Sequence, residues 1–146
     1  MAETYTVLCG VAAPYLESNV STNTISVQKA HGAGGVEEGV SPNDLFSGLR
    51  FERDGTEIGS FVLNRAPFRD AKFLLTGSNF GCGSSREAAV HALAAFGIRC
   101  VVAPSFGDIF YNNCFKNGVL PIVLPESELL ALAADAERGG VFRADL

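Results

Sequence analysis

The stretch from Lys72 to Pro104 reads KFLLTGSNFGCGSSREAAVHALAAFGIRCVVAP. Its first six residues predict a central strand, because they form a short apolar run that ends at a glycine. The Ala-rich run from Ser85 to Phe96 predicts a helix that stops at Gly97. The last six residues, RCVVAP, predict a second buried strand. The order strand, helix, strand is typical of parallel strands joined by a right-handed crossover.

The same alternation continues toward the C-terminus. A second helix is predicted from Ser105, as its N-cap, to about Asn117. A strand (119–124), a helix (127–138) and a last strand (141–146) follow. We therefore predict an α/β fold with parallel strand–helix units in the C-terminal half.

The N-terminal half is richer in predicted strands and loops. Tyr5–Ala13 and Ile58–Asn64 have the apolar and β-branched composition of strands. The polar segment 18–27 predicts a turn that leads into a further short strand. The Gly-rich segment 31–48 predicts a mobile surface loop. We expect residues 1–146 to form a single domain, because this length fits one hydrophobic core.

Charge and hydropathy disfavour several classes of protein. Sixteen acidic and eleven basic residues give a net charge of -5, which is the wrong sign for binding a nucleic-acid backbone or an anionic bilayer. No apolar run reaches the roughly 18 residues that a membrane span needs. The N-terminus has no basic residues ahead of its apolar stretch, unlike a secretion signal. We expect a cytoplasmic protein that binds neither nucleic acid nor membrane.

The cysteines suggest packing rather than metal binding. They stand at positions 9, 82, 100 and 114, with no CxxC pair, and neither histidine is spaced for a zinc site. We therefore predict that the chain binds no metal of its own. The thiols are expected to be reduced and mostly to pack in the core. Cys82 is the exception, because it lies in a Gly-rich turn.

The densest signal for a site is the segment GSNFGCGSSRE, from Gly77 to Glu87. It lies between a predicted strand and a predicted helix, where ligands bind in α/β sheets. Its three glycines allow backbone donors to approach a ligand closely. The segment does not match a dinucleotide loop, a phosphate loop or a GxSxG nucleophile elbow. His91 lies two turns into the helix, which disfavours a Ser-His-Asp triad.

Two interpretations of the residues from Ser84 to Glu87 stay open. A Ser followed three residues later by Glu is a capping box, which is a purely structural arrangement. A Ser oxygen at the N-terminus of a helix is also where an alkoxide is least costly. Arg86 adds a planar guanidinium suited to a carboxylate. The same residues therefore also predict a turn that binds a carboxylate or a phosphate.

Three segments carry a resemblance to a known family. FVLNRAPF (61–68), LLTGSNFGCGSSREAA (74–89) and RCVVAPSFGDIFYNNCFKNGVLPIVLP (99–125) resemble the small subunit of 3-isopropylmalate dehydratase, which is homologous to the swivelling C-terminal domain of aconitase. A weaker match begins at Gly10. The resemblance implies a swivelling β/β/α domain and a heterodimer with an aconitase-like large subunit. It implies that the large subunit holds a 4Fe–4S cluster and that this chain binds no cofactor.

The resemblance also implies a reaction and roles for individual residues. The reaction is the interconversion of 2- and 3-isopropylmalate by dehydration and rehydration, in leucine biosynthesis. Ser84 matches the catalytic base, which takes the proton from the carbon next to a carboxylate. Ser85 and Arg86 match residues that hold a carboxylate of the hydroxy-dicarboxylate substrate. Thr22 and Asn23 fall in a segment that contributes to substrate binding in the family.

The chain also departs from the family pattern. Where the family usually has NVDTDQIIP, this chain has NVSTNTISV (19–27), so both acidic positions are lost, to Ser21 and Asn23. The histidine that usually follows SSRE is Ala88. Family members commonly continue beyond the position of Leu146, which suggests a truncated or naturally short form.

Three functions are compatible with these residues. The first is the small subunit of an isopropylmalate-isomerising hydro-lyase. The second is a paralogous subunit that acts on another 2-hydroxy di- or tricarboxylate, as the change at Asn23 would permit. The third is a non-catalytic subunit that binds a partner and has lost turnover.

Overall fold

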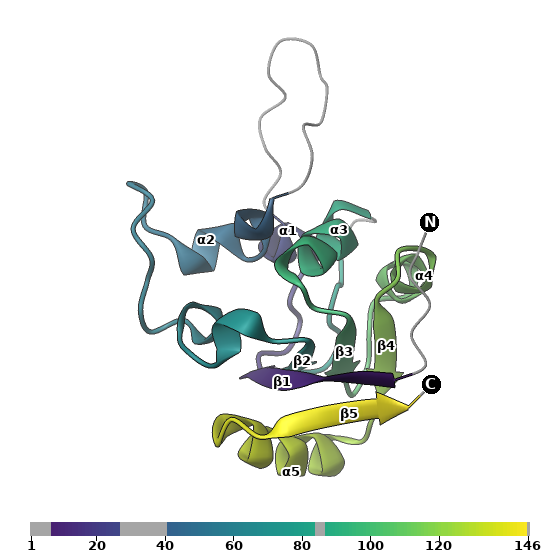
Figure 1. Cartoon of the computed structure of the whole chain (residues 1–146). Coiled ribbons are helices and arrows are strands. Elements are labelled where there is room, and N and C mark those ends of the chain that lie inside the picture. Colours follow the sequence, from purple (N-terminus) through teal and green to yellow (C-terminus); the bar gives the residue numbers. More distant parts are fainter. Residues whose placement is uncertain (1–6, 27–40, 84–86, 146) are drawn as a thin grey trace.

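The computed structural model describes residues 7–26, 41–83 and 87–145, and these residues form one five-stranded sheet with helices on both faces (Figure 1). The strand order is β4-β3-β2-β1-β5. The strands are β1 (Val7–Tyr15), β2 (Phe73–Thr76), β3 (Cys100–Ala103), β4 (Leu120–Val123) and β5 (Val141–Asp145). Strands β1 to β4 are parallel, and β5 runs antiparallel to β1.

The strand–helix units predicted for the C-terminal half are confirmed. Helix α3 (Glu87–Phe96) connects β2 to β3, α4 (Asp108–Lys116) connects β3 to β4, and α5 (Glu126–Glu137) connects β4 to β5. Helix α3 ends as predicted at Gly97, which has a positive φ of +114°. Its N–H donates to the Leu93 carbonyl. The parallel direction predicted for the last strand is wrong. After α5 the chain crosses the sheet and pairs β5 with the free edge of β1.

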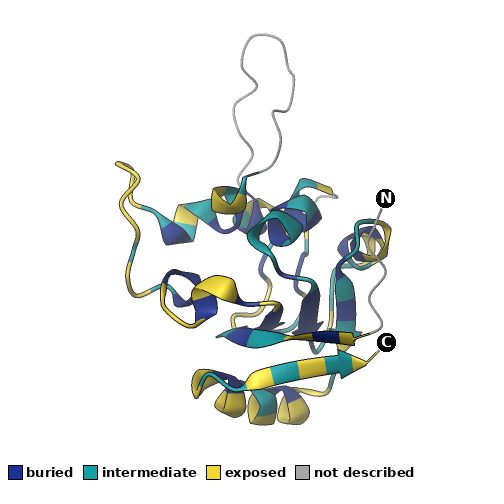
Figure 2. Ribbon diagram, in the orientation of Figure 1, coloured by how far each residue is buried: buried dark blue, intermediate teal, exposed yellow. Residues whose placement is uncertain are grey.

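Two apolar layers hold the helices on the sheet. Alternate side chains of the central strands point to opposite faces, so Leu74 and Val101 pack under α3 and α4, whereas Leu75 and Val102 pack against α5. Strands β2 and β3 are buried along their whole length, as is typical of parallel strands with helices on both faces (Figure 2). The rigid centre of the sheet therefore fixes the ends of β1, β2 and β3 relative to one another.

The strand predicted at 58–64 is wrong. Residues Val62–Asn64 form a 3-10 turn, and Val62, Leu63 and Asn64 are all buried. The Asn64 side-chain amide donates to the carbonyls of Arg50 (2.8 Å) and Ile58 (2.9 Å), which folds the segment back on itself. The apolar residues of this segment thus fill the core from a turn rather than from a strand.

The segment 18–27 contains a short helix where a strand was predicted. Helix α1 (Thr22–Ile25) is capped by Ser21, whose Oγ accepts from the Thr24 N–H at 3.2 Å. Residues 41–48 of the predicted loop form a 3-10 turn (Pro42–Asp44) and the start of α2 (Ser47–Arg50). The remainder of that loop, 31–40, lies outside the described residues, and the single domain over 1–146 stays a prediction. None of the helices in residues 7–26, 41–83 and 87–145 combines the length and the hydropathy of a membrane span.

Candidate active site

Three loops meet where β1, β2 and β3 reach their carboxyl ends. Because these strands are parallel and adjacent, their following loops leave the sheet at the same edge. We call the loop after β1 (16–21) the first loop, the turn after β2 (77–83) the glycine turn, and the loop after β3 (104–107) the third loop. The predicted site segment Gly77 to Glu87 begins with the glycine turn and ends at the first residue of α3.

The first loop and the glycine turn are joined by backbone hydrogen bonds. The Gly81 N–H donates to the Val20 carbonyl at 2.7 Å, and the Thr22 N–H donates to the Cys82 carbonyl at 3.0 Å. Ser21 and Cys82 form a parallel β-bridge. These bonds hold the start of α1 beside Cys82, two residues before Ser84.

The third loop is joined to the other side of the glycine turn. The Phe80 N–H donates to the Ser105 carbonyl (3.1 Å), and the Gly107 N–H donates to the Phe80 carbonyl (2.9 Å). The backbones approach so closely that a Cβ at Gly107 would lie 2.5 Å from the Gly81 carbonyl oxygen. The glycine turn is therefore held from both sides.

The Ser105 side chain binds the glycine turn and does not cap α4. Its Oγ accepts from the Asn79 N–H at 2.8 Å, while Gly107 occupies the N-cap of α4 without a side-chain cap. The N-cap predicted at Ser105 is therefore wrong. The hydroxyl satisfies a donor of the glycine turn instead of a donor of the helix.

Aromatic rings form the floor beneath the glycine turn. Phe80 is fully buried, and its ring meets those of Phe106 and Phe110 edge-on, with centroids 6.5 and 5.4 Å away. Gly81, at φ +78°, lies directly against the Phe110 ring, so that no Cβ fits there. Such close packing leaves the turn little room to shift.

The structure describes only some of the predicted site residues. Ser84, Ser85 and Arg86, with the predicted capping box, lie outside the described residues, between Gly83 and the first residue of α3. Asn23 is exposed on α1, and Thr22 is only 1% exposed. The backbone hydrogen bond from the Thr22 N–H to the Cys82 carbonyl brings their helix, α1, to the glycine turn. The substrate-binding roles of Thr22 and Asn23 stay predictions. His91 bonds through Nε2 to Asn117 Oδ1 at 3.0 Å, on the body of α3.

Two asparagines near the site were not among the predicted residues. Asn19 and Asn79 both adopt a left-handed backbone, each at φ 58°, and the Asn79 Nδ2 donates to Asn19 Oδ1 at 3.0 Å. Asn is the residue other than Gly that tolerates this conformation best. The repeated Ser-Asn dipeptide, at 18–19 and 78–79, is the signal that would have found the pair.

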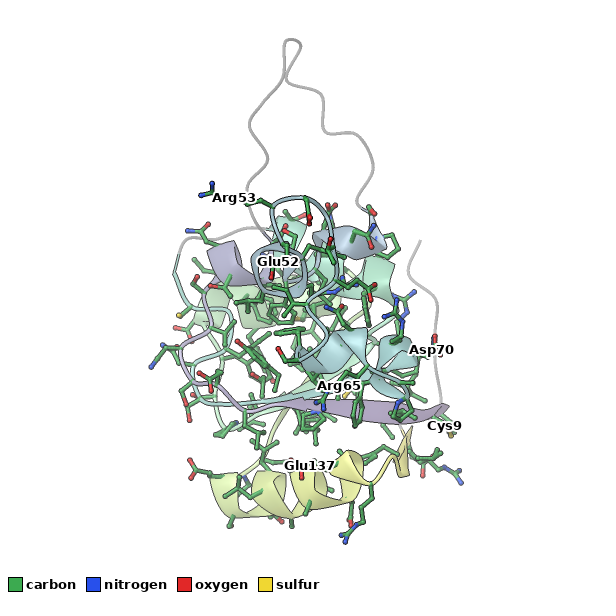
Figure 3. The ribbon with its side chains drawn as sticks, turned by 90° about the vertical axis from the view of Figure 1, so that its left-hand side faces the viewer. Cys9, Glu52, Arg53, Arg65, Asp70 and Glu137 are labelled. Carbon is green, nitrogen blue, oxygen red and sulfur yellow. The ribbon has the colours of Figure 1, made fainter. Side chains whose placement is uncertain are left out.

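The cysteines of this chain do not fit an iron–sulfur cluster. Cys100 and Cys114 are buried, and burial raises the pKa of each thiol to about 12. Cys9 is exposed at the start of β1 (Figure 3), on a different element from Cys82 in the glycine turn. Among the residues that the structure describes, no three His, Cys, Asp or Glu side chains are grouped to hold a metal ion. A cluster needs several converging thiolates, and no such group is found where the structure describes the four cysteines.

We expect this burial to control thiol reactivity. At pH 8 a thiol with a pKa of about 12 is ionised in about one molecule in 10,000, and only the thiolate reacts rapidly with iodoacetamide. Mass spectrometry of the native protein should therefore show carbamidomethylation at Cys9 and none at Cys100 or Cys114. Unfolding in guanidinium should expose all four thiols. Rapid labelling of Cys114 in the native state would contradict the described core.

Comparisons with known proteins agree with the fold and with the family resemblance that the sequence motifs indicate. Residues 2–127 match the family described as aconitase C-terminal domain. A protein of Dinoroseobacter shibae named 3-isopropylmalate dehydratase small subunit is 53% identical over 137 residues, which are 94% of this chain and 67% of that protein. A protein of the same name from Parvibaculum lavamentivorans is 55% identical over 132 residues, 90% of this chain and 65% of that protein.

A solved structure extends the agreement to three dimensions. The crystal structure of a 3-isopropylmalate dehydratase from Methanocaldococcus jannaschii matches with a TM-score of 0.58 and 28% identity, over 84% of this chain and 65% of that chain. The chain thus spans about two thirds of the length of the relatives that it matches. The predicted α/β swivelling fold is confirmed.

Proposed function

This chain belongs to the aconitase C-terminal domain family, and from this premise we propose that it is the small subunit of a hydro-lyase of the 3-isopropylmalate dehydratase type. In this role it pairs with an aconitase-like large subunit, and the pair interconverts 2- and 3-isopropylmalate. The names of the relatives support the subunit and the reaction. The cytoplasmic location stays a prediction from the sequence.

One structural observation carries the proposal. The first loop and the third loop both bond to the glycine turn, which leads directly into the segment 84–86 and α3. This brings α1 and the N-terminal end of α3 to one edge of the sheet. Free N–H groups and the positive end of the helix dipole favour an anion at such a position. A substrate carboxylate is the anion that fits the proposed reaction.

The proposed chemistry divides among a few side chains. Ser84 takes the proton from the carbon beside a carboxylate, aided by the N-terminal end of α3, which stabilises an alkoxide. Ser85 donates a hydrogen bond to that carboxylate, and Arg86 binds it through two parallel N–H groups. Asn23 contacts the substrate from α1, and the buried Thr22 contributes to substrate binding through its N–H, which holds α1 to the Cys82 carbonyl. Holding the carboxylate rigidly fixes the carbon–hydrogen bond in front of Ser84.

The 4Fe–4S cluster belongs to the large subunit in this proposal. The described thiols offer no site for it in this chain, so no step of the proposed mechanism passes through it. The active site is then an interface, to which this chain contributes the base and the carboxylate-binding groups. The heterodimer is the smallest assembly that contains both parts.

Co-expression with the cognate large subunit tests the proposal. We expect co-purification of the two chains and conversion of 2-isopropylmalate to 3-isopropylmalate, followed through the absorbance of the unsaturated intermediate, with neither chain active alone. A matched control omits only this chain from the same preparation. A stable complex that turns over no hydroxy acid would favour the non-catalytic subunit and would refute the enzymatic proposal.

A second candidate function has one structural observation in its favour. Ser21 stands where the family usually has an acid, and here its hydroxyl caps α1 and lies 3.2 Å from the Thr24 hydroxyl. Together with Asn23, this removes two negative charges beside the glycine turn. A more anionic substrate, such as a 2-hydroxytricarboxylate, would be repelled less. Turnover of such an acid in the same assay, without turnover of isopropylmalate, would select this candidate.

A further inference from the structure

A buried arginine lies at the base of α1. Arg50, the last residue of α2, is only 4% exposed. Within the described ranges, no carboxylate lies within ion-pair distance of its guanidinium. Glu57 acts on it only at longer range and is itself paired with Arg69. Burying a charge that has no direct ion-pair partner is costly, so its hydrogen bonds and ring contacts need to compensate. This makes Arg50 unusual among the described charged residues.

The contacts of the Arg50 side chain go to neutral oxygens and to aromatic rings. Its Nη1 donates to the carbonyls of Pro42 (2.9 Å) and Leu45 (3.1 Å), and its Nε donates to Asn64 Oδ1 at 3.1 Å. The guanidinium carbon lies 4.8 Å from the ring centroid of Phe51 and 5.0 Å from that of Phe96. This environment satisfies the planar fork of an arginine and not the point charge of a lysine.

The backbone held by Arg50 is strained. Phe46 follows Leu45 and has a left-handed backbone, with φ 50° and ψ 35°, although it is fully buried and aromatic. A bulky residue is unfavourable in this region and persists only where its surroundings impose it. The Arg50 guanidinium binds the carbonyl of the preceding residue, Leu45, and the backbone N–H at position 50 donates to the Phe46 carbonyl at 2.9 Å, so the turn is held on both sides of the Phe46 Cα.

The strained turn is bonded directly to α1. The Phe46 N–H donates to the carbonyl of Ile25, the last residue of α1, at 2.8 Å, and Leu45 forms an antiparallel bridge with Ser26. The other end of α1 bonds through Thr22 to Cys82 of the glycine turn. A continuous chain of hydrogen bonds therefore runs from the guanidinium to the candidate site.

We propose that Arg50 is a positioning residue that holds α1 against the glycine turn through the backbone of Leu45 and Phe46. It touches no substrate in this scheme. Its part in catalysis rests on the proposed function, because α1 carries Thr22 and Asn23. Its part in placing α1 rests only on its hydrogen bonds and ring contacts.

Hydrogen exchange of the full chain tests the placement. In Arg50→Lys, which keeps the charge and loses the fork, the amides of Phe46 and Thr22 should exchange about tenfold faster, while those of β2 and β3 stay within a factor of about two. Arg53→Lys is the matched control, because Arg53 is exposed and points away from the body of the molecule (Figure 3). Equal acceleration of all amides, or a profile like that of Arg53→Lys, would overturn the proposal. If Arg50→Lys does not fold, Asn64→Ser removes the acceptor of the Arg50 Nε together with the amide bonds to the carbonyls of Arg50 and Ile58, and it should still accelerate exchange at Phe46 and Thr22 more than in β2 and β3.

Kinetics of the complex with the large subunit test the part in catalysis. We expect Arg50→Lys to raise KM for the hydroxy acid roughly tenfold while kcat changes less than about threefold, because a displaced α1 weakens substrate binding rather than proton removal. A merely structural loss would lower the amount of active complex and leave KM unchanged, and that result would overturn the assignment. If the wild-type complex is inactive, the proposed function fails, and amide exchange at Thr22 alone decides whether Arg50 places α1.

Discussion

Replacing Ser84 with alanine is expected to lower kcat of the assembled enzyme by about a thousandfold, with little change in KM. The magnitude is that of losing a general base, which contributes about 10²- to 10⁴-fold. KM should hold because Ser85 and Arg86, the proposed carboxylate ligands, are still present. Steady-state kinetics on purified complex, with 2-isopropylmalate as substrate, measure both constants.

The control for this change is Ser127→Ala. Ser127 is an exposed serine on α5, which lies on the other side of the sheet from α3 (Figure 1). The Ser127→Ala variant loses the same hydroxyl group as Ser84→Ala and should retain wild-type kinetics and stability. If Ser84→Ala keeps full turnover, the base is another group, and the proposed mechanism is wrong even where the complex is active.

Local sequence patterns predicted the centre of the fold well. Strands β2 and β3 and helix α3 each follow from a short apolar or Ala-rich run that ends at a glycine or proline. Whether β5 runs parallel or antiparallel depends on which sheet edge is free, and that is a property of the whole chain. The strand predicted at 58–64 is wrong for a related reason. The turn there depends on contacts between Asn64 and Arg50, which are 14 residues apart in the sequence.

The sequence predicted which segment forms the candidate site, but not the hydrogen bonds that hold this segment in place. The glycines and the strand–helix junction identified residues 77–87, since backbone approach and helix termini have a clear sequence signature. The bonds from Val20 and Ser105 to the glycine turn have none, because they join backbone atoms of loops that are distant in sequence. Arg50 was missed for the same reason. Its importance lies in carbonyl groups, which every residue carries.

Replacing Gly107 with alanine is expected to damage both stability and activity. The backbone of Gly107, at φ -62° and ψ 137°, is allowed for any residue, so the effect comes only from the added methyl group. That Cβ would lie 2.5 Å from the Gly81 carbonyl oxygen and 3.2 Å from the Cys82 Cα, and backbone cannot rotate away as a side chain can. Overpacking of this kind costs roughly 1 to 3 kcal/mol, or about 3 to 10 °C in Tm for a chain of this size.

The activity of Gly107→Ala should fall further than its stability explains. The third loop and the glycine turn would separate by several tenths of an ångström, and the segment that carries Ser84 begins two residues after Cys82. A displacement approaching 1 Å costs up to about 10²-fold in rate, so we expect kcat/KM to fall by about ten- to a hundredfold at a temperature where the variant is folded. Gly59→Ala is the matched control, since Gly59 is exposed and a Cβ there meets no atom within 4 Å. Wild-type kcat/KM in folded Gly107→Ala would show that the third loop does not position the catalytic segment.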